Sequence, residues 1–306
     1  MFRQIVVLDK TGLQNWALER LNKFSQNPIR VYEDIPTTDR EISQRIKDAD
    51  CVFVSWSTQL SGQALSSAKD LKYVGMCCSL YDRKSANVDI DYAEKNGITV
   101  TGVRDYGDEG LVEYIISELI RLIKGIGSQQ WKTEPVELTG RKVGIIGMGT
   151  TGKMLADRLQ AFGAKVYYFN RSRKPQAEKD GIIYLPLNEL LESTEIISIH
   201  LPKNTTILNR DEFTKFGNGK VLINTSLGLT FDKSAFDNWI SNQTNYAIFD
   251  GDGIGNYKQE FDNFQNIIST EVVSGWTKEA QERLSLKVLD NLLDYIKNTT
   301  ANKEKM

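Results

Sequence analysis

The sequence predicts an α/β protein made of two doubly wound parallel-sheet domains. Short β-branched runs alternate with amphipathic stretches, which is the pattern of a parallel sheet covered by helices on both faces. The alternation stops at a polar, proline-containing segment, Gly125–Gly140, and a second series begins at Lys142. The 306 residues also correspond to about two domains at roughly 150 residues each. We place the first α/β unit at residues 1–105 and the second at residues 106–273.

The elements of the first unit follow from the spacing of apolar residues. Leu13, Trp16, Ala17, Leu21 and Phe24 recur at helical intervals and predict a helix after the first strand. The predicted strands of this unit are Ile5–Leu8, Ile29–Tyr32, Cys51–Val54, Tyr73–Cys77 and Ile98–Val103, and its other predicted helices are Glu41–Lys47 and Asp89–Asn96.

The second unit opens with a long helix, Asp108–Lys124, that carries apolar residues along one side. Apolar residues four apart between Ala280 and Ile296 predict a final helix, which this spacing alone assigns to neither unit. The polar tail Asn298–Met306 is expected to fray. The predicted strands of the second unit are Val143–Ile146, Val166–Phe169, Ile196–Ile199, Val221–Asn224, Ala247–Asp250 and Ile267–Thr270.

Composition excludes several classes of function. The formal charge of −2 and the pI of about 5.7 provide no global field to hold nucleic acid or an anionic membrane. The N-terminal residues lead straight into a predicted strand, so we expect no signal peptide. The longest stretch without charged residues, Cys51–Ala68, is rich in Ser, Thr and Gln, so we expect no membrane span.

The cysteines and the single histidine narrow the chemistry further. Cys51, Cys77 and Cys78 have no metal-type spacing, and we expect a reducing, cytoplasmic protein without disulfides or metal. The two adjacent cysteines are expected to pack at a strand end, because there is no second histidine to activate them. His200 is the one histidine, which excludes chemistry that needs two imidazoles.

A glycine loop follows the first strand of the second unit. Gly147, Gly149 and Gly152 form the pattern G-x-G-x-x-G between that strand and a predicted helix, Lys153–Ala161. The first glycine allows the tight turn, the second lets the backbone approach a pyrophosphate, and the third permits close packing of helix on strand. The helix N-terminus then faces the phosphates. The loop therefore predicts a dinucleotide site.

The end of the next strand indicates which dinucleotide binds. An NAD site favours an acidic residue here for the ribose hydroxyls, and this chain has Asn170 instead. A carboxylate would repel a 2′-phosphate, whereas Ser172 with Arg171 and Arg173 would attract one. We therefore expect NADP, with NAD as the alternative. The competing interpretation is that the two arginines belong to a solvated loop.

The order of these pieces resembles the D-2-hydroxyacid dehydrogenase family over nearly the whole chain. The resemblance implies a flavodoxin-like substrate domain of residues 1–105 and 274–306, a Rossmann cofactor domain of residues 106–273, an active cleft between them and a homodimer. The segments that carry the resemblance are Trp131–Gly152, Glu195–Pro202, Val221–Ser226, Ala247–Asp250 and Ser274–Ala280.

The glycine loop and the resemblance together imply a set of cofactor-binding residues, in which Asp250 would meet the nicotinamide amide. His200 is expected to be a wall of this site or a packing residue rather than a catalyst. The expected cofactor-binding residues are Gly147, Gly149, Thr150, Thr151, Gly152, Asn170, Arg171, Ser172, Arg173, His200, Leu201, Pro202, Thr225, Ser226, Asp250 and Gly275.

The resemblance also implies three catalytic groups, and this chain lacks at least two of them. An arginine would grip the substrate carboxylate, a histidine would pass the proton, and a glutamate would keep that histidine protonated. These positions are occupied by Leu227, Val272 and Gly255, although Glu260 lies close to the last one. Leucine and valine can neither donate a proton nor bind a carboxylate.

Other side chains are candidates for the missing roles. Arg104 would replace the carboxylate anchor, and Tyr81 or Lys278 would donate the proton, although solvated surface positions explain the last two somewhat better. The sequence Asp250–Gly253 adds carboxylates near the expected nicotinamide site. The acidic pair Asp108–Glu109 is more simply explained by the N-terminus of its helix.

Three hypotheses about function remain open at this point. The first is an NADP-dependent oxidoreductase with a rebuilt active site that acts on a small CH–OH or C=O compound. The second is a catalytically degenerate NADP-binding sensor or interaction protein. The third is an ordinary 2-hydroxyacid dehydrogenase whose catalytic groups lie elsewhere in the chain. Whether Leu227 and Val272 line the nicotinamide pocket would decide this hypothesis.

Overall fold

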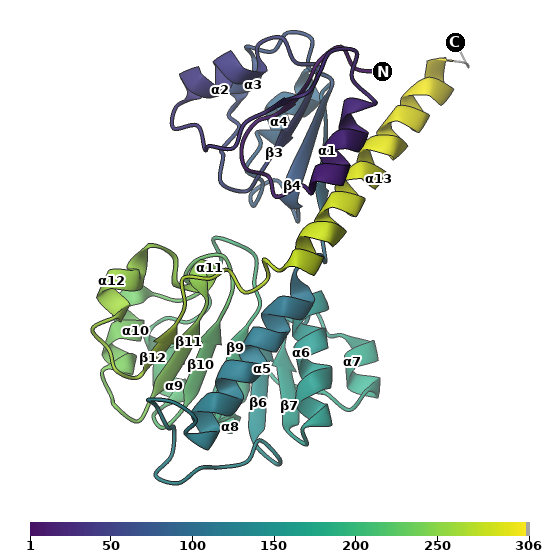
Figure 1. Cartoon of the computed structure of the whole chain (residues 1–306). Coiled ribbons are helices and arrows are strands. Elements are labelled where there is room, and N and C mark those ends of the chain that lie inside the picture. Colours follow the sequence, from purple (N-terminus) through teal and green to yellow (C-terminus); the bar gives the residue numbers. More distant parts are fainter. Residues whose placement is uncertain (304–306) are drawn as a thin grey trace. The chain divides into compact units, whose positions relative to one another are not determined.

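A computed structural model describes residues 1–303 of the chain. Its described residues form two compact units, each with its own sheet. Unit 1 contains Met1–Tyr106 and the segment from Thr277 onward, and unit 2 is Gly107–Trp276. Each unit has a parallel sheet with helices on both faces, as the alternation of strands and helices predicted (Figure 1).

Unit 1 has a five-stranded sheet, within the described residues, in the order β2-β1-β3-β4-β5. This order is that of flavodoxin-like sheets. The elements are β1 (Ile5–Val7), α1 (Asn15–Asn22), β2 (Arg30–Val31), α2 (Asp39–Ile46), β3 (Cys51–Val54), α3 (Gly62–Leu65), β4 (Tyr73–Ser79), α4 (Ile90–Lys95), β5 (Thr99–Val103) and, from the end of the chain, α13 (Lys278–Lys303).

The C-terminal helix completes unit 1. Helix α13 packs against α1, β4 and β5, and its Leu284, Val288 and Leu292 are buried (Figure 1). The ring of Tyr295 lies 4.8 Å from the ring of Tyr73, measured between centroids. Helices α2, α3 and α4 cover the opposite face around a second set of buried apolar side chains. The helix that spacing alone could not assign therefore belongs to unit 1.

Unit 2 has a seven-stranded sheet, among the residues described, in the order β12-β11-β10-β9-β6-β7-β8. The order from β11 to β8 is that of a dinucleotide-binding sheet. The elements are α5 (Asp108–Lys124), β6 (Lys142–Ile146), α6 (Thr150–Ala161), β7 (Lys165–Phe169), α7 (Pro175–Lys179), β8 (Ile183–Tyr184), α8 (Leu187–Ser193), β9 (Ile196–Ile199), α9 (Arg210–Phe216), β10 (Val221–Asn224), α10 (Lys233–Ile240), β11 (Tyr246–Phe249), α11 (Gly251–Ile254), the 3₁₀ turn Gly255–Tyr257, α12 (Lys258–Phe261) and β12 (Ile267–Ser269).

Both faces of the second sheet are closed by apolar side chains. Helices α5, α6 and α7 cover one face, and α8, α9 and α10 cover the other with a group of stacked aromatic rings. The strands between them are almost continuously apolar, because both of their faces are buried. The carboxyl edge of this sheet is then the part of unit 2 whose loops are free to carry function.

Two expectations about the elements are wrong. The tail from Asn298 does not fray within the described residues, because α13 continues to Lys303, while residues 304–306 lie outside the described part. Helix α6 begins at Thr150 rather than at Lys153. The short helices α7–α10 were not predicted, since segments of five to eight residues hold about two turns and show little periodicity.

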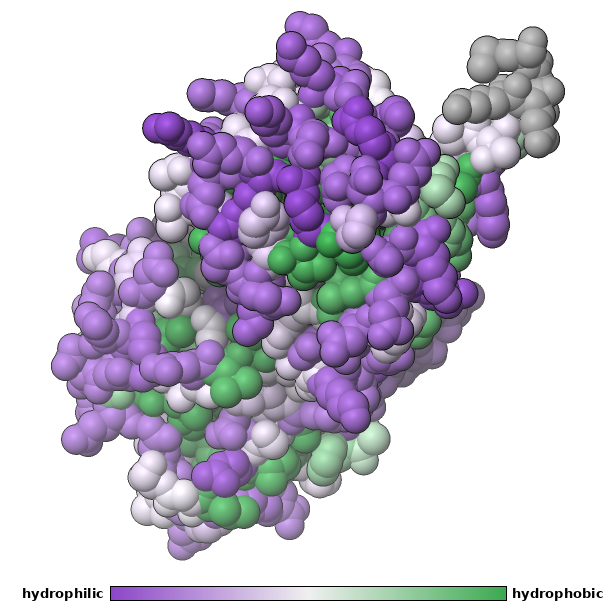
Figure 2. Space-filling view, turned by 45° about the horizontal axis from the view of Figure 1, so that its top comes forward, coloured by the Kyte–Doolittle hydropathy of each residue, from purple (hydrophilic) through white to green (hydrophobic). Residues whose placement is uncertain are grey.

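The cysteines pack as expected. Cys51, Cys77 and Cys78 are buried, and burial raises the pKa of the Cys51 and Cys77 thiols well above the usual value. The surface drawn in Figure 2 is mostly hydrophilic, with hydrophobic residues in separate patches. Among residues 1–303, none of the helices combines the length and the apolar character needed to cross a bilayer.

Candidate functional site

The candidate site is the carboxyl edge of the sheet in unit 2. Strand β6 pairs with β7 on one side and with β9 on the other, so the direction of strand succession reverses between β6 and β9. Ligands of open α/β sheets bind outside the carboxyl ends of the strands at this reversal point. The loops after Ile146 and Ile199 meet there.

The three glycines of the loop after β6 have three different environments. Gly147 has φ +97°, and a Cβ added to it would lie 2.1 Å from the carbonyl oxygen of His200. A Cβ on Gly152 would lie 2.1 Å from the carbonyl oxygen of Gly147. A Cβ on Gly149 would meet no atom of the described residues within 4 Å. The first and third glycines are thus required by packing, and the second leaves open space.

The N-terminus of α6 faces this open space. The backbone N–H groups of its first turn are available there, because Gly149 provides no side-chain cap. Thr150 is exposed, and the Thr151 hydroxyl donates a hydrogen bond to the carboxylate of Asp108. Asp108 and Glu109 lie in the first turn of α5, where negative charge is favourable, although the cap itself is Gly107. Asp108 therefore also anchors α6 to α5.

The loop after β7 is organised by Asn170. Its carboxamide oxygen accepts from the Met148 N–H at 3.3 Å, and its NH₂ group donates to the Ser172 carbonyl at 2.9 Å. The amide at the position of the usual acid thus ties two loops together. Arg173 is engaged by the carboxylate of Glu178, with Nε 2.9 Å from Oε1. Arg171 is exposed and forms no ion pair with the described residues.

His200 at the end of β9 is a neutral packing residue. Its backbone N–H donates to Ile146, and its Nε2 lies 2.9 Å from the Ser198 hydroxyl. Burial lowers the pKa of His200 to about 4, so the ring is uncharged near neutral pH. The backbone carbonyl of His200 lies against Gly147 and leaves no room there for a Cβ.

The two hydroxyl groups at the end of β10, those of Thr225 and Ser226, differ in their hydrogen bonding. The Ser226 hydroxyl donates to the Ile199 carbonyl at 3.2 Å and accepts from the Leu201 N–H at 3.1 Å, so it joins the loops after β9 and β10. Pro202, which follows, is exposed. The buried Oγ1 of Thr225 has no hydrogen-bond partner among the described residues. A buried hydroxyl without a partner fits a bound polar ligand, because leaving it unpaired is costly.

Asp250 at the end of β11 holds its own neighbourhood together. Its carboxylate accepts from the Gly253 N–H at 2.8 Å, from the Ser274 N–H at 3.0 Å and from the Ser274 hydroxyl at 2.6 Å. Burial raises the pKa of Asp250 despite these donors. The segment that Asp250 fixes leads directly to Gly275, which lies against Gly107 with no room for a side chain on either residue.

The three positions at which the resemblance implies catalytic groups lie near α11. Leu227 is 40% exposed after β10, and Val272 is 67% exposed after β12. The Gly251 N–H donates to the Val272 carbonyl at 3.0 Å, which joins the start of α11 to that loop. Gly255 has φ +56° and lies near Gly228.

The acidic residues near α11 that could take over a catalytic role differ in whether another side chain already engages them. Glu260 forms an ion pair with Lys233, at 2.8 Å between Oε2 and Nζ, and is not placed beside Gly255 by any contact within the described residues. Asp252, in the first turn of α11, has its pKa raised to about 6 by burial, with the charge of Asp250 as a smaller cause. The sequence indicated carboxylates at Asp250 and Asp252, but it did not indicate that their hydrogen-bond partners differ.

The remaining candidates, Arg104, Tyr81 and Lys278, all belong to unit 1. Arg104 donates from Nε to the Leu80 carbonyl at 2.8 Å and from Nη2 to the Tyr81 carbonyl at 3.0 Å, and it lies over the Tyr81 ring. Lys278 is exposed at the start of α13. Arg104 therefore fixes the loop after β4, which uses part of its capacity to bind an anion.

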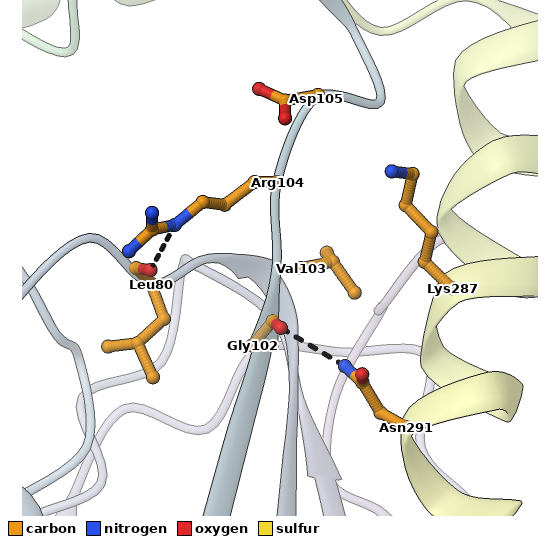
Figure 3. Close-up of a pocket in the computed structure, with 7 residues that line it drawn as sticks. All are labelled: Leu80, Gly102, Val103, Arg104, Asp105, Lys287 and Asn291. Carbon is orange, nitrogen blue, oxygen red and sulfur yellow. Dashed lines mark hydrogen bonds between the residues drawn. The ribbon is translucent and has the colours of Figure 1, made fainter. Parts of the chain in front are cut away.

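Arg104 borders a pocket of about 390 Å³ at the end of β5. Figure 3 shows its side chain turned toward Leu80, while Lys287 extends from α13 on the other side of the strand. Asp105 stands beyond them with φ +55°, a conformation that is uncommon for a residue with a side chain. The pocket is thus lined by two cations and one carboxylate of unit 1.

Comparison with known proteins agrees with this arrangement. Residues 114–251 match the family model of the D-isomer specific 2-hydroxyacid dehydrogenase NAD-binding domain. A hydroxypyruvate reductase of Blautia hydrogenotrophica is 26% identical, with 98% of each chain covered. A D-lactate dehydrogenase of Aquifex aeolicus, solved with NAD and lactic acid, shares the fold with a TM-score of 0.79, 20% identity and coverage of 97% of this chain and 96% of that one.

An acyclic imino acid reductase, solved with NADPH and D-Arg, also shares the fold, with a TM-score of 0.82, 22% identity and coverage of 96% of this chain and 97% of that one. The family match lies within unit 2, whose strand order and glycine loop are those of a dinucleotide-binding domain. Residues 114–251 are therefore similar to the NAD-binding domain of the D-isomer specific 2-hydroxyacid dehydrogenases, and the whole chain is similar to a reductase at 26% identity.

Proposed function

We propose that the protein is an NADP-dependent oxidoreductase that interconverts a CH–OH and a C=O group with catalytic residues different from those of its relatives. The observation that carries this proposal is a glycine loop of the dinucleotide-binding type after β6, in the same sheet whose strands β10 and β12 are followed by Leu227 and Val272. This assignment of the loop is supported by the packing of Gly147 and Gly152 and by the open space at Gly149. A nicotinamide dinucleotide bound there would supply or accept the hydride.

Several residues of unit 2 would hold the cofactor. The N–H groups at the start of α6 would bind the pyrophosphate, and the unpartnered Thr225 hydroxyl would donate to a polar group of the ligand. Asn170 leaves no carboxylate for the ribose hydroxyls, while Arg171 is exposed and without an ion pair among the described residues. Both features favour a 2′-phosphate over a 2′-hydroxyl.

The preference for NADP makes a direct prediction for Arg171→Ala. Removing the one arginine of this loop that no carboxylate engages is expected to weaken NADPH binding about tenfold, since a charge-assisted hydrogen bond contributes about 1.5–3 kcal/mol. NADH binding should change less than twofold. Arg173→Ala is the matched control, and because Glu178 already engages that arginine its effect on NADPH should be smaller. Equal losses for NADPH and NADH would contradict the assignment.

The substrate is expected to lack the carboxylate of a 2-oxo acid. The arginine position is an exposed leucine and the histidine position an exposed valine. Neither side chain carries a charge that could bind an anionic group of the substrate, and both can contact an apolar group. We propose a small carbonyl or alcohol compound, handled by a cytoplasmic homodimer; light scattering of the purified protein would decide the oligomeric state.

The same two residues favour one alternative function. Exposed apolar side chains where catalysis needs polar ones would also suit a degenerate NADP-binding sensor or interaction protein. Such a protein would bind the dinucleotide tightly and turn nothing over.

One experiment separates the two functions. NADPH is titrated against the protein by fluorescence, with NADH in parallel, and then 2-oxo acids, aldehydes and ketones are added while nicotinamide absorbance is followed. Tight binding followed by loss of absorbance with an aldehyde or ketone supports the enzyme. Binding without loss across the panel supports the sensor, and the absence of NADPH binding contradicts both.

A further inference from the structure

Asp252 lies between the two loops that carry the missing catalytic positions. It follows Gly251, whose N–H donates to the Val272 carbonyl at 3.0 Å. Its own carbonyl accepts from the Gly228 N–H at 2.9 Å, in the loop that contains Leu227. The backbone at Asp252 is therefore bonded to the loop after β10, and the residue before it to the loop after β12.

The glycines on both sides of Asp252 make this placement possible. A Cβ on Gly251 would lie 2.5 Å from the Glu271 carbonyl oxygen, and a Cβ on Gly253 would lie 2.0 Å from the Asn224 carbonyl oxygen. The first turn of α11 is thus packed directly against two strand ends. Of the three residues Gly251–Gly253, only Asp252 carries a side chain.

The contacts of the Asp252 carboxyl indicate no structural role for it. No hydrogen bond from another described residue contributes to its pKa shift, whereas the neighbouring Asp250 carboxylate accepts three hydrogen bonds. The charged groups that act on Asp252 are Asp250 and Lys203, the second of which lies in the loop after β9. Glu271 contributes its backbone carbonyl to this packing.

We propose that Asp252 is the acid–base group of the reaction, in place of the histidine found in relatives; this inference rests on the function proposed above. In the reducing direction the carboxyl proton of Asp252 passes to the substrate carbonyl oxygen. A reduced nicotinamide dinucleotide held at the glycine loop would supply the hydride to the carbonyl carbon. The π bond of the C=O group is replaced by one C–H and one O–H bond, and the Asp252 carboxylate regains a proton from water.

The electrostatics of the site agree with this role. Burial, and then the charge of Asp250, raise the pKa of Asp252 to about 6, while Lys203 opposes the shift. A carboxyl group with this pKa keeps part of its protons near neutral pH, as a general acid must. Reduction should therefore be fastest below about pH 6 and decline above it, and oxidation should show the opposite trend.

The first test replaces Asp252 by asparagine. Asp252→Asn is expected to lower the rate of reduction by at least about 100-fold, with NADPH affinity unchanged within about twofold, and to remove the decline above about pH 6. Asp262→Asn is the matched control, because that exposed carboxylate of unit 2 forms its ion pair within the described residues with Lys258 and should leave the pH profile unchanged. Lys203→Met should move the break to higher pH, since Lys203 lowers the pKa of Asp252.

A second readout needs no cofactor. A carboxyl group whose folded-state pKa lies above its unfolded value stabilises the protein at low pH and loses that contribution as the pH rises through the folded-state pKa. The Tm of Asp252→Asn minus the Tm of the unaltered protein should thus increase as the pH rises from about 4 to about 7.

The outcomes separate this inference from the proposed function. Turnover by Asp252→Asn at an unaltered rate and with an unaltered pH profile overturns the role of Asp252 and leaves the oxidoreductase in place. A Tm difference that is constant with pH also overturns it. If the unaltered protein binds NADPH but reduces no compound, both proposals fail.

Discussion

Gly147→Ala is expected to destabilise unit 2 and to abolish dinucleotide binding. The added Cβ would stand 2.1 Å from the His200 carbonyl oxygen, and the backbone at φ +97° is one that residues with side chains rarely adopt. The close contact is with backbone, which cannot move aside as a flexible side chain would. Overpacking and backbone strain each cost about 1–3 kcal/mol, so a loss of at least about 2 kcal/mol is expected in denaturant unfolding.

Gly149→Ala is the control that separates folding from binding. Its Cβ would meet nothing within 4 Å among the described residues, and its φ of −86° suits alanine. Stability should therefore change by less than about 0.5 kcal/mol. NADPH affinity should still fall, because the methyl group would occupy the space in which the pyrophosphate approaches the backbone. Equal stability losses for the two variants would show that the loop is merely a structural turn.

The sequence predicted the sheets more fully than the helices. The strands of unit 2 are short β-branched runs such as Ile196–Ile199, whose burial on both faces is visible in their composition. Helices α9 and α10 span seven and eight residues and were missed. Their signals were capping residues: Asn209 with Glu212 forms a capping box, and the Asp232 side chain accepts from the Ala235 N–H.

The site was predictable only in part, because much of it joins distant segments. The roles of the glycines could be inferred, since each depends on backbone geometry next to one strand and one helix. The hydrogen bond between Thr151 and Asp108 joins residues 43 positions apart, and no local pattern indicates it. Likewise, no local pattern distinguishes Asp252 from Asp250, because the hydrogen bonds that place Asp252 join it and Gly251 to the distant loops at Gly228 and Val272.

Leu227→Arg combined with Val272→His is expected to create activity toward 2-oxo acids. Both native side chains are exposed, so the larger replacements need not displace buried groups. The arginine would supply a clamp for the substrate carboxylate, and the histidine an acid with an ordinary pKa near 6.5. An effective general acid contributes about 10²–10⁴-fold, so even a poorly oriented pair should raise kcat/KM for a 2-oxo acid by at least about tenfold.

The same pair of substitutions in the Asp252→Asn background identifies which group moves the proton. If the new histidine donates it, reduction of the 2-oxo acid should persist without Asp252, and the break in the pH profile should move toward the pKa of an imidazole. Leu227→Arg with Val272→Gln is the matched control, since glutamine can form hydrogen bonds but cannot give up a proton to the substrate. Activity from the glutamine variant equal to that of the histidine variant would show that position 272 takes no part in proton transfer. Gly255 should be left unchanged in these variants, because glutamate at φ +56° would add backbone strain to a loop that contacts Gly228.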